Sequence, residues 1–316
     1  MLALQAYLRD HNYEFQPPPP HAVLAARTAS VNVVAYQSRK LVVQGKGAGE
    51  FVEFILEPLI LKKAEVGYEE VLHPERLLPR IGVDESGKGD FFGPLCVAGV
   101  YVNEPVLRAW KDAGIQDSKN IGSDRRIAEL AKLIRHTPGC VWNVVPIGND
   151  AYNRLYRSMR SVNTLLAWGH ARVIENLMER EHLMQPPPVK AISDQFAHDK
   201  ATVAKALMER GRAIELVQRH KAEEDAAVAA ASILARDEFV TRLKMLEKKT
   251  GVPLPKGASA AVDATAKTIA ETHGKAGLEA ISKTHFRTYL RALGLPEPPK
   301  REWTKRSSKD ADESPD

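Results

Sequence analysis

Apolar and polar positions alternate along the first part of the chain. The alternation runs over 26–36 and again over 39–44, on either side of a Gln-Ser-Arg turn, which predicts a β-hairpin. Apolar residues then recur at helical spacing over 50–56, and Pro58 is expected to end or kink that helix. This strand–strand–helix unit predicts a small separate domain over residues 1–64.

The remainder of the chain reads as strands and helices in alternation. After a charged linker expected at 65–79, two apolar, β-branched runs, Ile81–Val83 and Leu95–Val102, flank a glycine-rich bend. Helices are predicted over 104–113, 123–135, 149–183 with a break near 158–162, 199–209, 221–236, 240–252, 262–273 and 278–282, and strands over 141–145, 189–196 and 213–218. The pattern indicates an α/β (α+β overall) domain over 80–295, followed by a disordered, charged tail at 296–316.

Composition narrows the class of protein. With 44% apolar and 27% charged residues among 316, the chain is typical of a globular protein with room for two domains. A net charge of +5 is compatible with a polyanionic partner but does not demand one. Two cysteines argue against a disulfide scaffold, and no secretory signal or apolar run of about 18–20 residues is present. We therefore expect a cytoplasmic protein with no membrane partner.

The bend after the first of the two apolar runs contains residues suited to binding a metal ion and a phosphate group. It begins with Asp84 and Glu85, and hard carboxylate oxygens are the ligands that Mg²⁺ prefers. Gly87 and Gly89 allow the backbone to approach a phosphate closely, and Lys88 adds a positive charge beside them. A plain tight turn with exposed acids and a solvated lysine fits the same residues, so the bend alone leaves both interpretations open.

The same bend almost matches the nucleotide-binding pattern G-x-x-x-x-G-K-[ST], starting at Gly82. The pattern fails at its last position, because Gly89 has no hydroxyl group to hold Mg²⁺. The residues that follow, 90–94, are also a poor opening for the helix that should receive the phosphates. We therefore expect no nucleotide cofactor.

Two further acids stand at the ends of predicted elements. Asp194 lies toward the C-terminal end of the predicted strand 189–196, the end where α/β sheets build their sites. Asp225 lies near the start of the predicted helix 221–236 and shares a face with Ser232 by helical spacing. Acids that complement a helix dipole and alanines that favour a helix also account for this second segment without a functional role.

These motifs together resemble the type 2 ribonucleases H, and specifically the bacterial ribonuclease HIII family. The resemblance rests on Asp-Glu-Ser-Gly-Lys-Gly-Asp with Phe-Phe-Gly-Pro behind it, on Asp-Ser-Lys at 117–119, and on Ala-Ala-Ala-Ser-Ile-Leu-Ala-Arg at 229–236. Lys88 favours HIII, because the sister family HII usually carries Gly-Arg-Gly there. The resemblance covers most of 80–290 and the first domain only loosely. It implies a ribonuclease H-like mixed sheet with flanking helices, preceded by a small TATA-binding-protein-like domain that grips nucleic acid.

The resemblance also implies a site. Asp84, Glu85, Asp194 and Asp225 would form the catalytic, metal-binding set, with two Mg²⁺ or Mn²⁺ ions expected when substrate is bound. The substrate-binding residues would be Ser86, Gly87, Lys88, Gly89, Lys119 and Ser232, with Lys40 and Lys46 in the first domain. The expected reaction is endonucleolytic hydrolysis of the RNA strand of an RNA–DNA hybrid, which leaves 5′-phosphate and 3′-hydroxyl ends.

Two other functions stay open. A ribonuclease HII-like enzyme that incises at single ribonucleotides in DNA would use the same acids, and a non-catalytic nucleic-acid-binding protein would explain the basic residues. Trp168-Gly169-His170 is also similar to the family, although a half-buried tryptophan and a packed histidine explain it without a ligand role. We expect a monomer, and the sequence leaves open the choice between Mg²⁺ and Mn²⁺ and the role of the tail.

Overall fold

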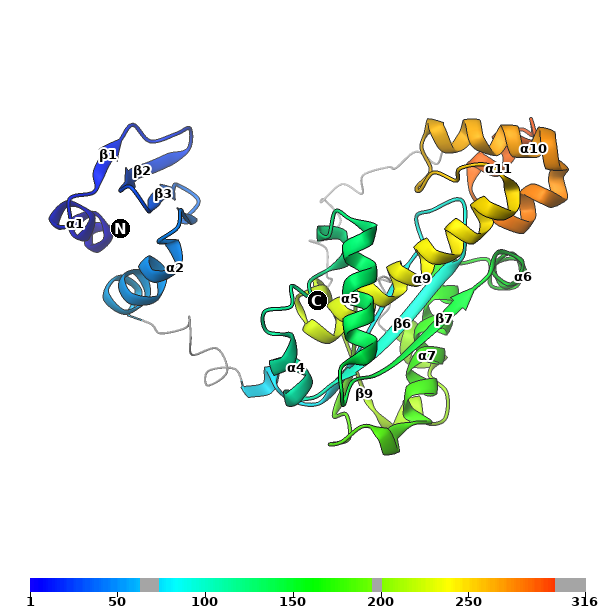
Figure 1. Cartoon of the computed structure of the whole chain (residues 1–316), viewed down its shortest axis with the longest axis horizontal. Helices are drawn as coiled ribbons and strands as arrows, with labels where there is room; N and C mark the ends of the chain where they lie inside the picture. The colour runs from blue at the N-terminus through cyan, green and yellow to red at the C-terminus, as the bar shows by residue number, and fades with distance from the viewer. Residues whose placement is uncertain (63–73, 195–200, 299–316) are drawn as a thin grey trace, which may run out of the picture. The chain divides into compact units, whose positions relative to one another are not determined.

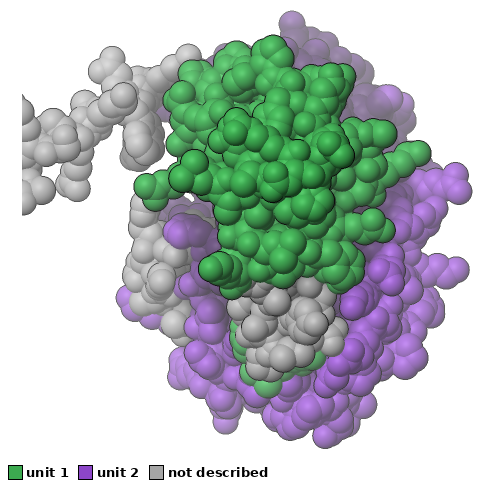
Figure 2. Space-filling model, turned by 90° about the vertical axis from the view of Figure 1, so that its left-hand side faces the viewer, with its two compact units in different colours: residues 1–78 green, residues 79–316 purple. Residues whose placement is uncertain are grey.

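A computed structural model describes residues 1–62, 74–194 and 201–298. The chain divides into two compact units, Met1–Leu78 and Pro79–Asp316, shown in different colours in Figure 2. Most of the predicted linker and most of the predicted tail lie outside the described residues.

The first unit is built on a four-stranded antiparallel sheet in the order β1-β2-β3-β4. Its strands are β1 (Glu14–Gln16), β2 (Ala22–Arg27), β3 (Asn32–Tyr36) and β4 (Leu41–Gln44). The β3–β4 hairpin is the predicted one, but the prediction missed β1 and joined the end of β2 to β3. Strand β1 has only three residues, and the run Ala-Val-Leu-Ala-Ala in β2 does not alternate with polar positions.

Helices pack on one face of this sheet. Helix α1 (Leu2–Asp10) and helix α2 (Ala48–Phe51) contribute Leu8 and Phe51 to a core shared with the strands. Of the two outcomes expected at Pro58, the helix does not end there: α2 is followed by the π-helix η1 (Val52–Leu61), which contains Pro58. Proline lacks an N–H group, so the residue at this position donates no backbone hydrogen bond in either type of helix.

The second unit contains a five-stranded mixed sheet in the order β7-β6-β5-β8-β9. The strands are β5 (Arg80–Ser86), β6 (Leu95–Val102), β7 (Val141–Ile147), β8 (Lys190–Asp194) and β9 (Glu215–Arg219). Strand β6 is antiparallel to β5 and β7, whereas β5, β8 and β9 run parallel. The acids predicted to lie in a turn are instead strand residues, because Asp84 pairs with Ala98 and Glu85 with Val97.

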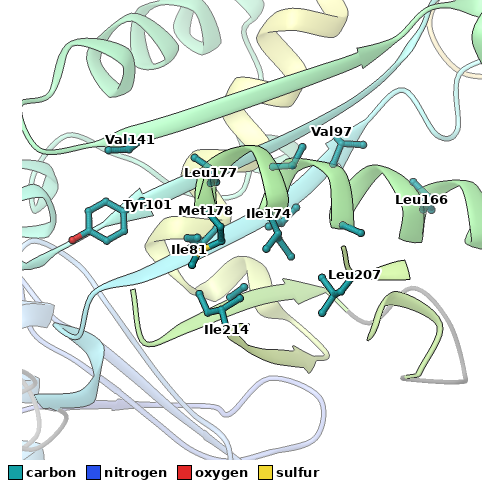
Figure 3. Packing of buried hydrophobic residues seen from close by; sticks show 14 of the residues in the cluster. Ile81, Val97, Tyr101, Val141, Leu166, Ile174, Leu177, Met178, Leu207 and Ile214 are labelled. Atoms are coloured by element: carbon teal, nitrogen blue, oxygen red, sulfur yellow. The ribbon is translucent and has the colours of Figure 1, made fainter. Parts of the chain in front are cut away.

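Helices cover both faces of this sheet (Figure 1), which confirms the predicted architecture. On one face, the side chains of β5 and β6 pack against α7 (Val162–Met178), and Figure 3 shows this core around Ile81, Val97, Ile174 and Leu177. Helix α6 (Asn149–Met159) precedes α7, with a break at Arg160, and short α8 (Ala201–Ala206) also packs there.

The opposite face carries α9 (Ala226–Thr250), α5 (Asp124–His136) and α4 (Glu104–Trp110). The approach of α9 to β5 is so close that a Cβ atom at Gly82 would lie 2.2 Å from the carbonyl carbon of Ala227. Small residues on both elements therefore bring the start of α9 against the strand that carries the acids.

Helix α9 begins later than predicted and runs further. Asp225 is its N-cap residue, and the short 3-10 turn η6 (Ala222–Glu224) precedes it, so residues 221–225 are not α-helical. The charged helix predicted over 240–252 belongs to the same helix, since α9 runs without interruption to Thr250.

Two C-terminal helices complete this unit. These are α10 (Ala260–Ile281), interrupted at Gly274, and α11 (Arg287–Ala292), which pack around Phe91 and Phe239. Shorter 3-10 turns are η2 (Pro74–Arg76), η3 (Ser118–Asn120), η4 (Glu181–Leu183) and η5 (Gly211–Ala213). Over the described ranges, no helix is long and apolar enough to cross a membrane.

Candidate active site

A pocket of about 490 Å³ opens where β5 and β8 end. It is lined by Asp84, Glu85, Ser86, Gly87, Lys88, Gly89, Asp90, Ser118, Lys119, Asp194, Arg236, Phe239, Val240 and Lys256. The fold therefore brings three of the predicted acids together with the glycine bend and Lys119. Asp225 and Ser232 do not line this pocket.

The two adjacent acids of β5 point to opposite faces of the sheet, because successive strand residues alternate. Glu85 follows the face of Val83, toward α7, where its Oε2 atom lies 3.0 Å from Nε2 of His170. The other ring nitrogen of His170 is 2.9 Å from Oγ of Ser193, and His170 is fully buried. A fixed imidazole thus orients Glu85, so His170 does more than fill the core.

The pKa values of Asp84 and Glu85 are shifted in opposite directions. Burial and the charge of Glu85 raise the pKa of Asp84 well above its ordinary value. Burial also acts to raise the pKa of Glu85, but the hydrogen bond and charge of His170, helped by Lys88, outweigh it and lower that pKa. The repulsion between the two neighbouring carboxylates therefore appears mainly as the raised pKa of Asp84, and a bound cation would reduce that repulsion.

Lys119 reaches this site from the η3 turn. Its backbone N–H donates to the Asp117 side chain at 3.2 Å, and the preceding N–H, that of Ser118, donates to Oγ of Ser232 at 2.9 Å. Partial burial acts to lower the pKa of Lys119, but nearby acids raise it: Asp117, Asp84, Glu223 and Glu85. Lys119 is therefore a charged ammonium group among acids.

Ser232 departs from its predicted role as a substrate contact. Its side chain is buried, with 1% of the residue exposed, and its hydroxyl group donates to the Ala229 carbonyl at 2.8 Å while accepting from Ser118. Ser232 therefore holds the turn that carries Lys119 rather than facing the pocket.

Asp225 also departs from the prediction. Nε of Arg80 donates to both of its carboxylate oxygens, at 3.1 and 2.8 Å, and the two side chains are only 4% and 9% exposed. One of those oxygens also accepts from the Ala227 N–H at 2.9 Å as the cap of α9. The Asp225 carboxylate is thus used in structural contacts, with Arg80 and with the first turn of α9. Sequence reasoning could not see this, since Arg80 is 145 positions away.

A different acid of the same segment approaches the site. Glu223, in η6, is among the charges that act on Lys119, and it lines a neighbouring pocket of about 500 Å³ with Asp117 and Asn120. The sequence signal was present, because Glu223 and Glu224 stand just before Asp225 in one acidic run. Because α9 starts at Ala226, Asp225 caps the helix, whereas Glu223 lies in the preceding turn and acts on the charge of Lys119.

The glycine bend is held in shape by residues distant in sequence. Gly87 has φ +91°, and a Cβ atom there would lie 2.3 Å from the Pro94 carbonyl oxygen, so only glycine fits. The buried Lys283 ammonium donates to the carbonyls of Asp90 and Gly93 at 2.8 and 2.6 Å. A Cβ atom at Gly89 would meet no described atom within 4 Å, so the backbone there is open to a ligand.

The remaining predicted residues belong to the outer part of the bend and to the first unit. Nζ of Lys88 lies 3.7 Å from Oε1 of Glu85. Lys40 is exposed in the β3–β4 turn, and Lys46 lines a hollow of about 430 Å³ with Arg27 and Gln44. Both stay predictions for nucleic-acid contact.

The donor set fits a hard divalent cation. Asp84, Glu85 and Asp194 supply carboxylate oxygens to one pocket, and Mg²⁺ commonly takes only one or two such ligands plus water and substrate phosphate. Over the described parts of the chain, no three His, Cys, Asp or Glu side chains already converge closely enough to hold a metal ion by themselves. Water molecules and a substrate phosphate would complete the coordination of a bound ion.

Comparison with known proteins identifies relatives of the whole chain. Residues 81–289 match the family model Ribonuclease HII, and residues 3–65 match a domain of unknown function (DUF3378). The chain is 47% identical to Ribonuclease HIII of Chlamydia pneumoniae over 90% of this chain and 92% of that protein, and 46% identical to Ribonuclease HIII of Chlamydia muridarum over 87% and 88%.

Solved structures are similar along nearly the whole chain. The crystal structure of Bst-RNase HIII in complex with Mn²⁺ has a TM-score of 0.64 at 30% identity, covering 92% of this chain and 95% of that one. The structure of Aquifex aeolicus RNase H3 has a TM-score of 0.54 at 25% identity, covering 89% and 94%.

Proposed function

The chain belongs to the ribonuclease HIII family, whose catalytic domain matches the ribonuclease HII model, and from this membership we propose that it cuts the RNA strand of RNA–DNA hybrids endonucleolytically. It is a ribonuclease H, a hydrolase that uses divalent metal ions, Mg²⁺ or Mn²⁺. The products of the proposed reaction carry 5′-phosphate and 3′-hydroxyl ends. The observation that carries the proposal is one pocket containing Asp84, Glu85 and Asp194 beside the glycine bend.

The proposed metal ligands are these three acids together with Glu223, which takes the place predicted for Asp225. Support for Glu223 is its action on Lys119, which the charges of Asp84 and Glu85 also reach. When bound, two divalent ions supply water activation and stabilisation of the departing 3′ oxygen. No nucleophile from the protein is required.

The chain's own residues bind and orient the substrate in this proposal. His170 fixes Glu85 through a 3.0 Å hydrogen bond, so this carboxylate needs little reorganisation. Backbone groups of Ser86–Gly89 contact the ribose 2′-hydroxyl group, which distinguishes RNA from DNA. Lys88 and Lys119, which both line the pocket, bind phosphates.

The proposal also gives a role to the first unit. We assign it a nucleic-acid-binding role in which Lys40 and Lys46 contact phosphates, supported by the basic hollow that Arg27 and Lys46 line. The domain boundaries at 64 and 80, a monomeric state and a cytoplasmic location are part of the same proposal. The two free cysteines, Cys96 and Cys140, are compatible with a reducing compartment.

Cleavage of two labelled duplexes tests the proposal. One is a long RNA–DNA hybrid and the other is DNA with a single ribonucleotide, each incubated with Mg²⁺, Mn²⁺ or EDTA. We expect metal-dependent cutting of the hybrid that is lost in Asp84→Asn. Efficient cutting at the single ribonucleotide would instead favour a ribonuclease HII-like function, and binding without cutting would refute the catalytic proposal.

The fourth acid is tested with matched variants. Glu223→Gln removes the proposed ligand, and Glu224→Gln removes the same charge from the adjacent residue, whose side chain is 70% exposed. We expect cleavage to fall only in Glu223→Gln and to recover partly at higher Mn²⁺ concentration. Equal activity of the two variants would remove Glu223 from the ligand set.

A further inference from the structure

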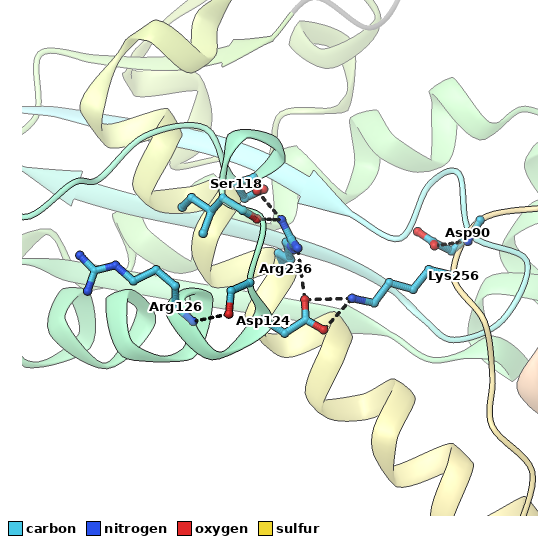
Figure 4. A network of polar contacts seen from close by, with 9 residues as sticks. Asp90, Ser118, Asp124, Arg126, Arg236 and Lys256 are labelled. Carbon is cyan, nitrogen blue, oxygen red and sulfur yellow. Dashed lines mark hydrogen bonds and ion pairs between the residues drawn. The ribbon is translucent and has the colours of Figure 1, made fainter.

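A second set of charges adjoins the pocket: Arg236 and Lys256 line it, and both bind Asp124 (Figure 4). Asp124, the first residue of α5, accepts from Nζ of Lys256 at 2.9 and 2.8 Å and from Nη2 of Arg236 at 3.2 Å. Arg236 also donates to the carbonyls of Ser118 and Ile121, so it is committed to the loop that carries Lys119. In contrast, the hydrogen bonds described for Nζ of Lys256 are both to Asp124.

The backbone on both sides of Lys256 is fixed. The N–H of Gly257 donates to the Asp90 carboxylate at 2.6 Å, and its carbonyl accepts from the Phe91 N–H at 2.9 Å. On the other side, Leu254 is buried and its N–H donates to Glu247 at 2.9 Å. The Lys256 side chain is 43% exposed and lines the pocket. A rigid loop therefore presents one movable cation at the rim of the site.

We propose that Lys256 binds a phosphate of the nucleic-acid strand and that Asp124 holds this cation only while the site is empty. The inference rests on the proposed function, because it assumes a nucleic acid in the pocket. On binding, the ammonium group exchanges one charge-assisted oxygen partner for another. Such an exchange is easy, since an ion pair at this exposure is weak.

The environment of Asp124 is suited to this exchange. Burial acts to raise its pKa, but hydrogen bonds and charges from Lys256 and Arg236 lower it. When Lys256 leaves, Asp124 keeps Arg236, so no carboxylate remains without a cation. The phosphate-binding role thus leaves the loop that carries Lys119 in place.

Binding measurements on the full chain test this role. The probe is a fluorescently labelled RNA–DNA hybrid in EDTA, where nothing is cut, titrated at several NaCl concentrations. We expect Lys256→Gln to weaken binding about 3- to 10-fold at low salt and to reduce the slope of log Kd against log salt by about 1, as for the loss of one phosphate contact. Lys256→Arg should bind like the wild type, as should Lys248→Gln, which removes an exposed lysine outside the pocket.

A double variant separates this role from a purely structural one. If Lys256 only neutralises Asp124, then Asp124→Asn combined with Lys256→Gln restores binding, and the proposal is overturned. If Lys256 contacts phosphate, the double variant stays as weak as Lys256→Gln, and Asp124→Asn alone binds at least as tightly as the wild type. An unchanged Kd and salt slope in Lys256→Gln would also overturn the proposal. A wild type that binds the hybrid but never cuts it would refute the proposed activity and leave this test intact.

Discussion

The substitution Asp225→Asn separates a structural acid from a catalytic one. Asparagine caps a helix about as well as aspartate, so the cap of α9 is kept. What changes is the buried ion pair with Arg80, whose two side chains are 4% and 9% exposed, together with a longer pair, at 3.8 Å, to the half-exposed Arg219. The variant leaves a buried guanidinium group facing a neutral amide, and breaking a buried pair in this way costs about 3–5 kcal/mol.

The retained amide oxygen still accepts a hydrogen bond from Arg80, so we expect the lower end of that range, about 3 kcal/mol. For a unit of this size, 1 kcal/mol corresponds to roughly 2–4 °C, which predicts a fall in Tm of about 6–12 °C. Cleavage by the folded enzyme at 25 °C should stay close to wild type. Calorimetry and hybrid cleavage measure the two effects on the same preparation.

Two companion variants make the prediction specific. Arg80→Met combined with Asp225→Asn removes both charges, and we expect it to be more stable than Asp225→Asn alone. Glu223→Gln should show the opposite pattern, with a nearly unchanged Tm and a loss of kcat of about 100-fold or more, as expected for a group acting on the transition state. A wild-type Tm together with abolished cleavage in Asp225→Asn would refute this reasoning and return Asp225 to the catalytic set.

Three other substitutions test contacts around the site. His170→Ala removes the ring that orients Glu85, and steady-state kinetics should show kcat lowered about tenfold or more; an unchanged kcat would contradict an orienting role. Gly82→Ala places a Cβ atom 2.2 Å from the backbone of α9, so thermal unfolding should show a loss of about 4 kcal/mol or more, and a wild-type Tm would contradict the close approach. Burial lowers the pKa of Lys283 from 10.5 to about 7, so the unfolded chain binds a proton that the folded chain lacks between these values. The free energy of unfolding should therefore rise with pH from about 7 to 10, and this rise should be smaller in Lys283→Met when urea unfolding is compared at several pH values.

Local patterns in the sequence were enough to predict many of the elements and several of the residues that line the pocket. Alternation and helical spacing predicted the β3–β4 hairpin, the strands β5 and β6 and the helix α5, because their apolar residues follow the period of each structure. Asp84, Glu85 and the glycine bend were found because acids and glycines adjoin within one short segment. Residues that adjoin in the sequence remain neighbours in any fold, so such a motif can be recognised without the structure.

Only the packing of whole elements brings together the distant residues that share the site. Asp225 and Glu223 stand in one acidic run, but Asp225 pairs with the buried Arg80, whereas the charge of Glu223 acts on Lys119. His170 reaches Glu85 because α7 covers that face of the sheet, and Lys256 reaches the rim because its loop is fixed to Asp90. The paired residues are 85 positions apart for His170 and Glu85, 145 for Arg80 and Asp225, and 167 for Asp90 and Gly257. No periodicity or spacing encodes such a contact, since it depends on the tertiary arrangement of strands and helices that are each specified locally.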